Sequence, residues 1–108
     1  MTNILHLAAT LCYVLNTEQL ADAIFKIEGG KATKWPYGIK CHRHTPLVAR
    51  RMCIRTVDHS YVEWSKLGKP GDFLDFLADR YCPPSCDPVG NKNWKRNIRK
   101  VLKCTPTP

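Results

Sequence analysis

The chain has 108 residues, the size of one small domain and too few for a dinucleotide-binding α/β domain or a (β/α)8 barrel. Its 44% hydrophobic and 24% charged residues are ordinary for a globular protein and argue against disorder. Seventeen Lys and Arg against nine Asp and Glu give a formal net charge of +8. This charge favours polyanionic partners: nucleic acid, anionic lipid or an acidic cell-wall polymer.

Residues 1–16 form an apolar N-terminal segment, most of it in the stretch Ile4–Leu15. This stretch is long enough for the core of a signal peptide but shorter than the ~20 residues that span a bilayer, so no transmembrane segment is expected. The segment does not begin with the Lys or Arg typical of a signal peptide, and no cleavage site of small residues follows it. The segment is therefore either an unusual export signal or a buried first helix.

A helix is predicted from Thr17, its expected N-cap, to the stop at Gly29-Gly30. Its apolar residues recur at helical spacing and are Leu20, Ala23, Ile24 and Ile27. The next residues, 31–45, are rich in turn formers and include Trp35-Pro36-Tyr37-Gly38. Such a composition predicts a short hairpin at most.

Thr45-Pro46 predicts the start of a long helix that ends at Gly68. The core stripe expected along it is Leu47, Ile54, Val57, Tyr61, Trp64 and Leu67. Asp72 opens a third helix, which Pro83-Pro84 ends because proline lacks an amide donor. Its expected core face is Phe73, Phe76, Leu77 and Tyr81.

A last helix is expected after a loop that runs to Gly90. One face is apolar, with Trp94, Ile98, Val101 and Leu102, and the rest carries Lys92, Lys95, Arg96, Arg99, Lys100 and Lys103. Residues 17–104 are thus predicted to be one mainly helical domain, followed by a tail at 105–108. No repeat and no strong strand pattern is present.

Six cysteines in so short a chain usually indicate disulfides in an exported protein. Cys41 and Cys53 are a plausible local pair, whereas a bond between Cys82 and Cys86 is disfavoured by the prolines between them. Zinc is an alternative because Cys41 lies beside His42 and His44, but neither cysteine cluster has the tight pairs typical of structural zinc. Free thiols in a reducing compartment are the third possibility.

Glu28 is the candidate catalytic residue. It closes the first predicted helix, and two glycines that permit a left-handed backbone follow it. The negative end of a helix dipole disfavours a negative charge, and a general acid must hold its proton. The alternative is a solvated glutamate before a glycine C-cap.

Glu28-Gly29-Gly30, followed by Pro36-Tyr37-Gly38-Ile39, resembles the lysozyme-like superfamily of lytic transglycosylases and phage endolysins. Arg80–Ser85, Asp87-Pro88, Asn93-Trp94 and Asn97 resemble the later part of some phage-type members, so the resemblance spans residues 20–102. It implies a mainly α, α+β lysozyme-like fold, with a short hairpin after the helix of the catalytic glutamate.

The resemblance assigns the general acid to Glu28 and implies no cofactor and no metal. Expected substrate-binding residues are Gly29, Gly30, Trp35, Tyr37, Gly38, Ile39, Tyr81 and Asn93. No acidic residue lies between Glu28 and Asp58, so a second carboxylate is missing from the hairpin region. A lone glutamate favours lytic transglycosylation, in which the sugar's own hydroxyl closes a 1,6-anhydro ring, over hydrolysis of the muramidase type.

The expected function is therefore cleavage of peptidoglycan glycan strands by an exported monomer in the periplasm, the cell envelope or the medium. A basic nucleic-acid-binding module is one alternative, since a helix with six basic residues could contact phosphates. A non-catalytic, disulfide-stabilised cell-wall-binding protein is another. Of these three functions, only the enzymatic one requires Glu28.

Overall fold

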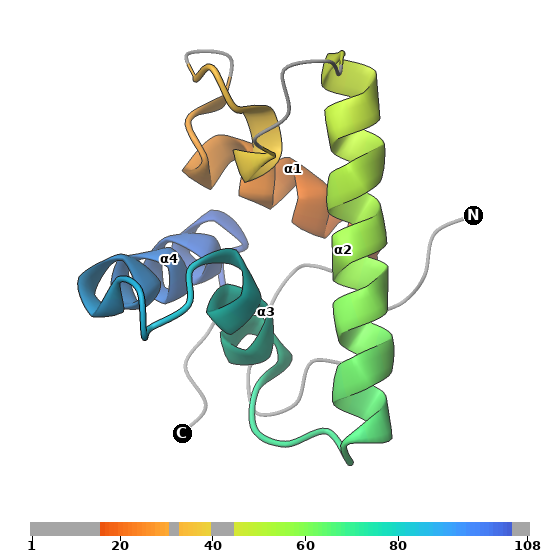
Figure 1. Ribbon diagram of the computed structural model, residues 1–108, viewed down its shortest axis with the longest axis vertical. Coiled ribbons are helices and arrows are strands. Elements are labelled where there is room, and N and C mark those ends of the chain that lie inside the picture. Colours follow the sequence, from red (N-terminus) through yellow and green to blue (C-terminus); the bar gives the residue numbers. More distant parts are fainter. Residues whose placement is uncertain (1–15, 31–32, 40–44, 105–108) are drawn as a thin grey trace.

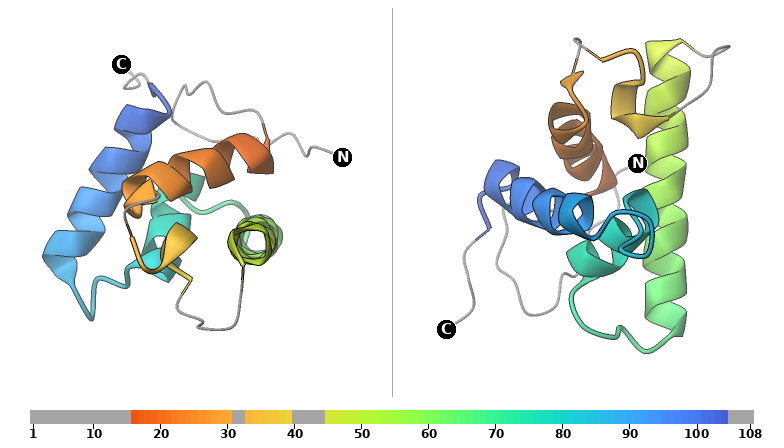
Figure 2. Two further views of the ribbon diagram at one scale, coloured as in Figure 1. Left: turned by 90° about the horizontal axis from the view of Figure 1, so that it is seen from above. Right: turned by 60° about the vertical axis from the view of Figure 1, so that its left-hand side comes forward.

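A computed structural model of the chain describes residues 16–30, 33–39 and 45–104, and it is mainly helical. In chain order the elements are α1 (Thr17–Ile27), the short 3-10 helix η2 (Pro36–Gly38), α2 (Pro46–Lys66), α3 (Phe73–Tyr81) and α4 (Pro88–Val101). Helix α2 stands along one side of the molecule (Figure 1). Seen along the α2 axis, the other helices gather to one side of it (Figure 2, left).

Capping side chains begin all four α-helices. Thr45 and Asp72 cap α2 and α3 as predicted, each accepting a hydrogen bond from a backbone N–H of the first turn. At α1 the prediction was wrong by one residue, because the Asn16 side chain accepts from the N–H of Gln19 at 2.8 Å. Helix α4 begins earlier than expected, since Asp87 caps it and Gly90 lies inside its first turn.

The expected hairpin is not shown. Among the described residues of that region, 33–39 form a turn and η2 instead of strands. The N–H of Gly38 donates to the carbonyl of Trp35 at 2.9 Å, and the N–H of Ile39 donates to that of Pro36 at 3.1 Å. Because these bonds close within the turn, the backbone is not extended for strand pairing. Residues 31–32 and 40–44 lie outside the described part.

The core forms where α1 and α3 pack against α2, and α4 closes it by contacting α1 and α3. Its largest fully buried side chains include Leu20, Ile24, Trp64, Phe73, Leu74, Leu77 and Ile98. Tyr61, Trp64 and Phe73 form an aromatic cluster with ring centroids 5.1–5.6 Å apart.

The core stripe predicted for α2 was partly wrong. Leu47 and Leu67 are 59% and 65% exposed. The buried positions of α2 are Ala49, Cys53, Val57, Ser60 and Trp64. These residues follow helical spacing, and most are small, which lets the neighbouring helices approach closely. Within the described residues, no helix is long and apolar enough to cross a membrane.

Candidate functional site

Glu28 is the C-cap residue of α1, and its side chain is held by a contact across the molecule. The Glu28 N–H donates to the carbonyl of Ile24 at 2.9 Å, which fixes its backbone to the last helical turn. Trp94 of α4, 66 residues later, donates its indole N–H to Glu28 Oε1 at 3.0 Å. The carboxylate is therefore tied to α4 and is not a freely solvated cap.

Gly38 approaches the Glu28 carboxyl so closely that a side chain would not fit. An ideal Cβ on Gly38 would lie 3.1 Å from both Cδ and Oε2 of Glu28. The φ angle of Gly38 is +71°, which L-amino acids with a side chain rarely adopt. Both observations require glycine here, and they place the backbone of η2 against one side of the carboxyl group while Trp94 binds the other oxygen.

A pocket of about 390 Å³ opens beside Glu28, a volume within the range of small-molecule sites. Its walls combine the end of α1, the turn before α2, the end of α3 and one face of α4. The lining residues are Ile27, Glu28, Thr33, Trp35, Gly38, Tyr81, Cys82, Gly90, Asn93, Trp94 and Asn97. Glu28 is the one acidic side chain among these described residues, and aromatic and amide side chains accompany it.

The structure brings together five of the nine predicted site residues in this pocket: Glu28, Trp35, Gly38, Tyr81 and Asn93. The others do not line it. Gly29 and Gly30 turn the chain away from α1 with φ of +101° and +57°. Ile39 is partly buried against the core.

Tyr37 is a core residue instead of a pocket residue. It is 6% exposed, and its ring packs 5.0 Å from that of Phe25. Its φ of +61° is unusual for a residue with a side chain. The predicted sugar contact at Tyr37 is therefore replaced by a structural one.

Sequence reasoning missed Trp94 and Asn97 as site residues. Trp94 lies in the core, as its apolar stripe predicts, and is 7% exposed; it also stacks on Tyr81 with ring centroids 5.4 Å apart. The available signal was the helical spacing of Asn93, Trp94 and Asn97, which puts them on one face of a helix. That face could be oriented toward Glu28 only by tertiary packing.

Arg50 of α2 joins the elements on one side of the site. Its Nη1 donates to Asp22 Oδ1 of α1 at 2.6 Å and to the hydroxyl of Tyr37 in η2 at 3.2 Å. Nη2 also donates to the carbonyl of Glu18 at 3.4 Å. The hydrogen bond with Tyr37 and the charge of Asp22 raise the pKa of Arg50. One guanidinium thus connects three elements, including the turn that carries Gly38.

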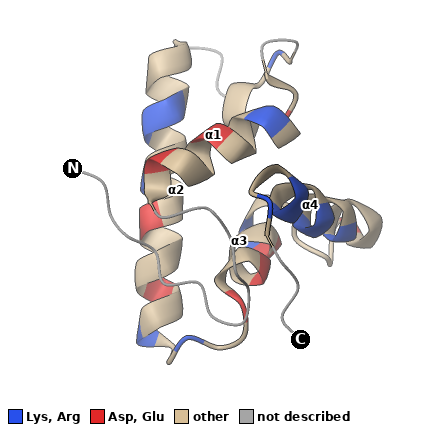
Figure 3. Cartoon of the chain, turned by 180° about the vertical axis from the view of Figure 1, so that it is seen from behind, with Lys and Arg blue, Asp and Glu red and all other residues tan. Residues whose placement is uncertain are grey.

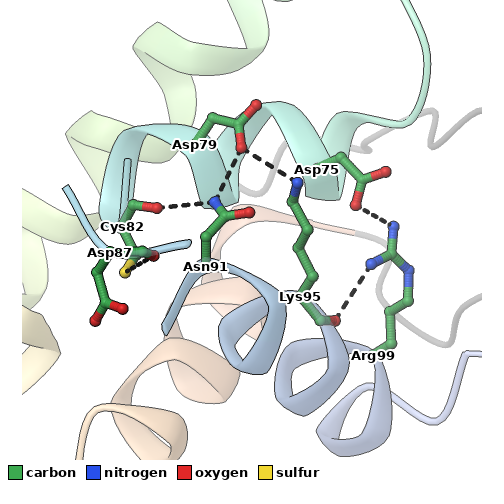
Figure 4. Close-up of polar contacts among 7 residues, drawn as sticks. All are labelled: Asp75, Asp79, Cys82, Asp87, Asn91, Lys95 and Arg99. Atoms are coloured by element: carbon green, nitrogen blue, oxygen red, sulfur yellow. Dashed lines mark hydrogen bonds and ion pairs between the residues drawn. The ribbon is translucent and has the colours of Figure 1, made fainter. Parts of the chain in front are cut away.

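On the other side, polar contacts join α3 and α4 (Figure 4). Asn91 donates to Asp79 Oδ1 at 3.0 Å and to the carbonyl of Cys82 at 2.8 Å. Lys95 pairs with Asp79 at 3.3 Å. Further along α4, Arg99 pairs with Asp75 at 2.7 Å and with Asp72 at 3.4 Å. These contacts, called here the α3–α4 seam, hold the helix that presents Trp94 to Glu28.

Cys53, Cys82 and Cys86 are free thiols, so the expected Cys41–Cys53 pair was wrong for Cys53. Cys53 is fully buried, accepts a hydrogen bond from the Tyr81 hydroxyl at 3.2 Å, and has its pKa raised by burial to about 11. Burial also raises the pKa of Tyr81. Cys104 is disulfide-bonded.

In the part of the chain that the structure covers, no group of three or more His, Cys, Asp or Glu side chains could hold a metal ion. The residues of the zinc alternative, Cys41, His42 and His44, lie outside the described residues. Comparison of the chain with models of known families, with curated proteins and with solved structures finds no match.

Proposed function

We propose that this chain is a lysozyme-like enzyme that cleaves the glycan strands of peptidoglycan, with Glu28 as the general acid. The observation that carries the proposal is the setting of one carboxyl group, which lies in a sugar-sized pocket between the indole N–H of Trp94 and the backbone of Gly38. Because peptidoglycan lies outside the cytoplasm, the proposal includes export to the periplasm, the cell envelope or the medium.

The proposed first step is proton transfer from Glu28 to the glycosidic oxygen, which lets the bond to the anomeric carbon break. Glu28 Oε1 is engaged by Trp94 at 3.0 Å, so Oε2 is the oxygen assigned to carry the proton. Trp35 and Tyr81 supply aromatic surface in the pocket on which sugar rings can pack. Positioning an acid in this way typically contributes about 10²–10⁴-fold to the rate.

The second step must deliver an oxygen to the anomeric carbon and return a proton to Glu28. Glu28 is the one acidic residue lining the pocket in the described part, so a second carboxylate is not at hand to activate water. In lytic transglycosylation the sugar's own 6-hydroxyl attacks the anomeric carbon, and its proton passes to the Glu28 carboxylate. The products then carry a 1,6-anhydro ring, and the enzyme recovers its acid.

Hydrolysis remains the alternative outcome of the same first step. It would need a water that attacks the anomeric carbon while Glu28 takes one of its protons. Thr33 lines the pocket and could hold such a water, whereas the buried Tyr37 hydroxyl already binds Arg50. The products distinguish the two routes, because hydrolysis yields reducing ends.

The ion pairs of α4 weaken the alternative that the chain binds nucleic acid. Lys95 and Arg99, two of the six basic residues counted toward a phosphate-binding face, are engaged by the carboxylates of Asp79, Asp75 and Asp72. A phosphate backbone would have to compete with these pairs.

The test is Glu28→Gln, measured on purified peptidoglycan beside the wild type. Gln keeps the shape and still offers an oxygen to Trp94, but it has no proton to donate. We expect cleavage to fall by about 10²–10⁴-fold while the folded variant still binds glycan strands. Mass spectrometry of the wild-type products should show 1,6-anhydro ends.

Glu18→Gln is the matched control, because it removes the same charge from an exposed position in the first turn of the same helix. It should leave cleavage unchanged. A folded Glu28→Gln protein that cleaved peptidoglycan at the wild-type rate would remove Glu28 as the acid and, with it, the main support for an enzyme.

A further inference from the structure

The six basic residues from Lys92 to Lys103, in α4 and just after it, fall into two groups that differ in what they contact. Lys95 and Arg99 face α3 and are neutralised there by aspartates. The other four, Lys92, Arg96, Lys100 and Lys103, are exposed, and the described residues form no ion pair with them. Blue residues along α4 show this concentration of positive charge (Figure 3).

Arg96 and Lys100 lie next to the pocket wall. Nη2 of Arg96 donates to Oδ1 of Asn93, a lining residue, at 2.7 Å. Lys100 lies three residues after Asn97, also a lining residue, and side chains at this spacing are neighbours on a helix surface. Neither Lys92 nor Lys103 lies three or four residues from Asn93 or Asn97.

A third cation borders the pocket from the turn before α2. Nζ of Lys34 lies 5.2 Å from the centroid of the Trp35 ring, and Trp35 is itself a lining residue. Lys34 is exposed and has no ion pair within the described residues. The pocket therefore has one carboxyl group inside and three cations, Lys34, Arg96 and Lys100, at its rim.

Cations at the rim of the pocket attract carboxylates that a bound ligand carries close to them. We infer that the three cations select glycan strands whose sugars bear anionic substituents, the carboxylates of peptides attached to the strand, over uncharged glycan strands. This inference rests on the proposed function and names the substrate class of the same site.

The experiment measures binding in the Glu28→Gln background, so that no strand is cut. Fluorescence of the tryptophans, two of which line the pocket, is titrated with soluble peptide-bearing glycan strands and with uncharged chitin oligosaccharides of equal length. The test variant is Arg96→Gln with Lys100→Gln. The matched control is Lys92→Gln with Lys103→Gln, which also removes two positive charges, one from α4 and one from just after it. Neither residue lies three or four residues from a lining asparagine.

We expect the test variant to bind the anionic strands about fivefold to tenfold more weakly, with binding of chitin oligosaccharides unchanged. The control should change either affinity by less than about twofold. The preference for anionic strands should shrink as salt shortens the screening length below ~8–10 Å. Equal losses in test and control variants would mean that only net charge matters, and would overturn the inference.

The two proposals can fail separately. If anionic strands bind with this dependence but the wild type cleaves none of them, the catalytic proposal fails and the inference stands. If the wild type cleaves peptide-bearing strands with a KM that does not change when Arg96 and Lys100 are replaced by Gln, the inference fails and the catalytic proposal stands.

Discussion

The two sides of the Glu28 site are built differently. On the side of α1, η2 and α2, a single guanidinium, that of Arg50 in α2, bonds to both α1 and η2. On the other side, the α3–α4 seam shares its bonds among three donors, Asn91, Lys95 and Arg99. The first side therefore depends on Arg50 alone for these bonds, whereas the α3–α4 seam can lose one contact and keep the others.

The difference matters because each side presents one group to the Glu28 carboxyl. The Arg50 side holds the turn that carries Gly38, and the seam holds the helix that carries Trp94. A loss on the Arg50 side also leaves the buried hydroxyl of Tyr37 without its guanidinium donor. Burying a polar group without its partner typically costs about 1–3 kcal/mol. We therefore expect the Arg50 side to be the more sensitive one.

The largest effect is expected at Gly38. Gly38→Ala places a Cβ about 3.1 Å from the Glu28 carboxyl and must displace it, so cleavage should fall by about 10²-fold. Gly71→Ala is the matched control, because Gly71 has a similar φ of +67° but nothing within 4 Å of its Cβ position. Both variants should lose about 1–2 kcal/mol of stability through backbone strain. Equal cleavage by the two would show that the close approach of Gly38 is unimportant.

The next largest effect is expected on stability, when Arg50 and Arg99 are replaced in turn. Arg50→Gln should lower the free energy of unfolding by about 1–2 kcal/mol, and Arg99→Gln by less than about 1 kcal/mol. The reason is that Asp72, a partner of Arg99, still caps α3 through the N–H of Leu74 at 2.7 Å. Thermal unfolding measures this, since each kcal/mol shifts Tm by roughly 4–8 °C in a domain of this size. The reverse order of the two variants would contradict the comparison.

The smallest effect concerns Cys53, where α2 meets Tyr81 of α3. The native protein treated with iodoacetamide at pH 8 should be modified at exposed Cys86 and remain unmodified at Cys53, because burial raises the pKa of Cys53 to about 11. Peptide mapping by mass spectrometry should find Cys53 modified only after unfolding. A disulfide at Cys53 in the non-reduced map would contradict the packing of α2 against α3.

Local sequence determined the helices and much of the site. Thr45-Pro46, Asp72 and Pro83-Pro84 set helix boundaries correctly, because capping and proline act over a few residues. Glu28 before two glycines was enough to select the candidate acid. Asp87-Pro88 carried the same kind of signal for the start of α4, although the prediction placed that start after Gly90.

Tertiary structure decided which groups meet Glu28 and which charges remain available. The Trp94 bond joins residues 66 apart, and no local pattern specifies such a contact. The same packing buried Tyr37 and neutralised Lys95 and Arg99, while leaving Arg96 and Lys100 exposed beside the pocket. Helical spacing shows which residues share a face, but the direction of that face depends on how the helices pack against one another, because burial of apolar surface is non-directional and is settled only by the whole core.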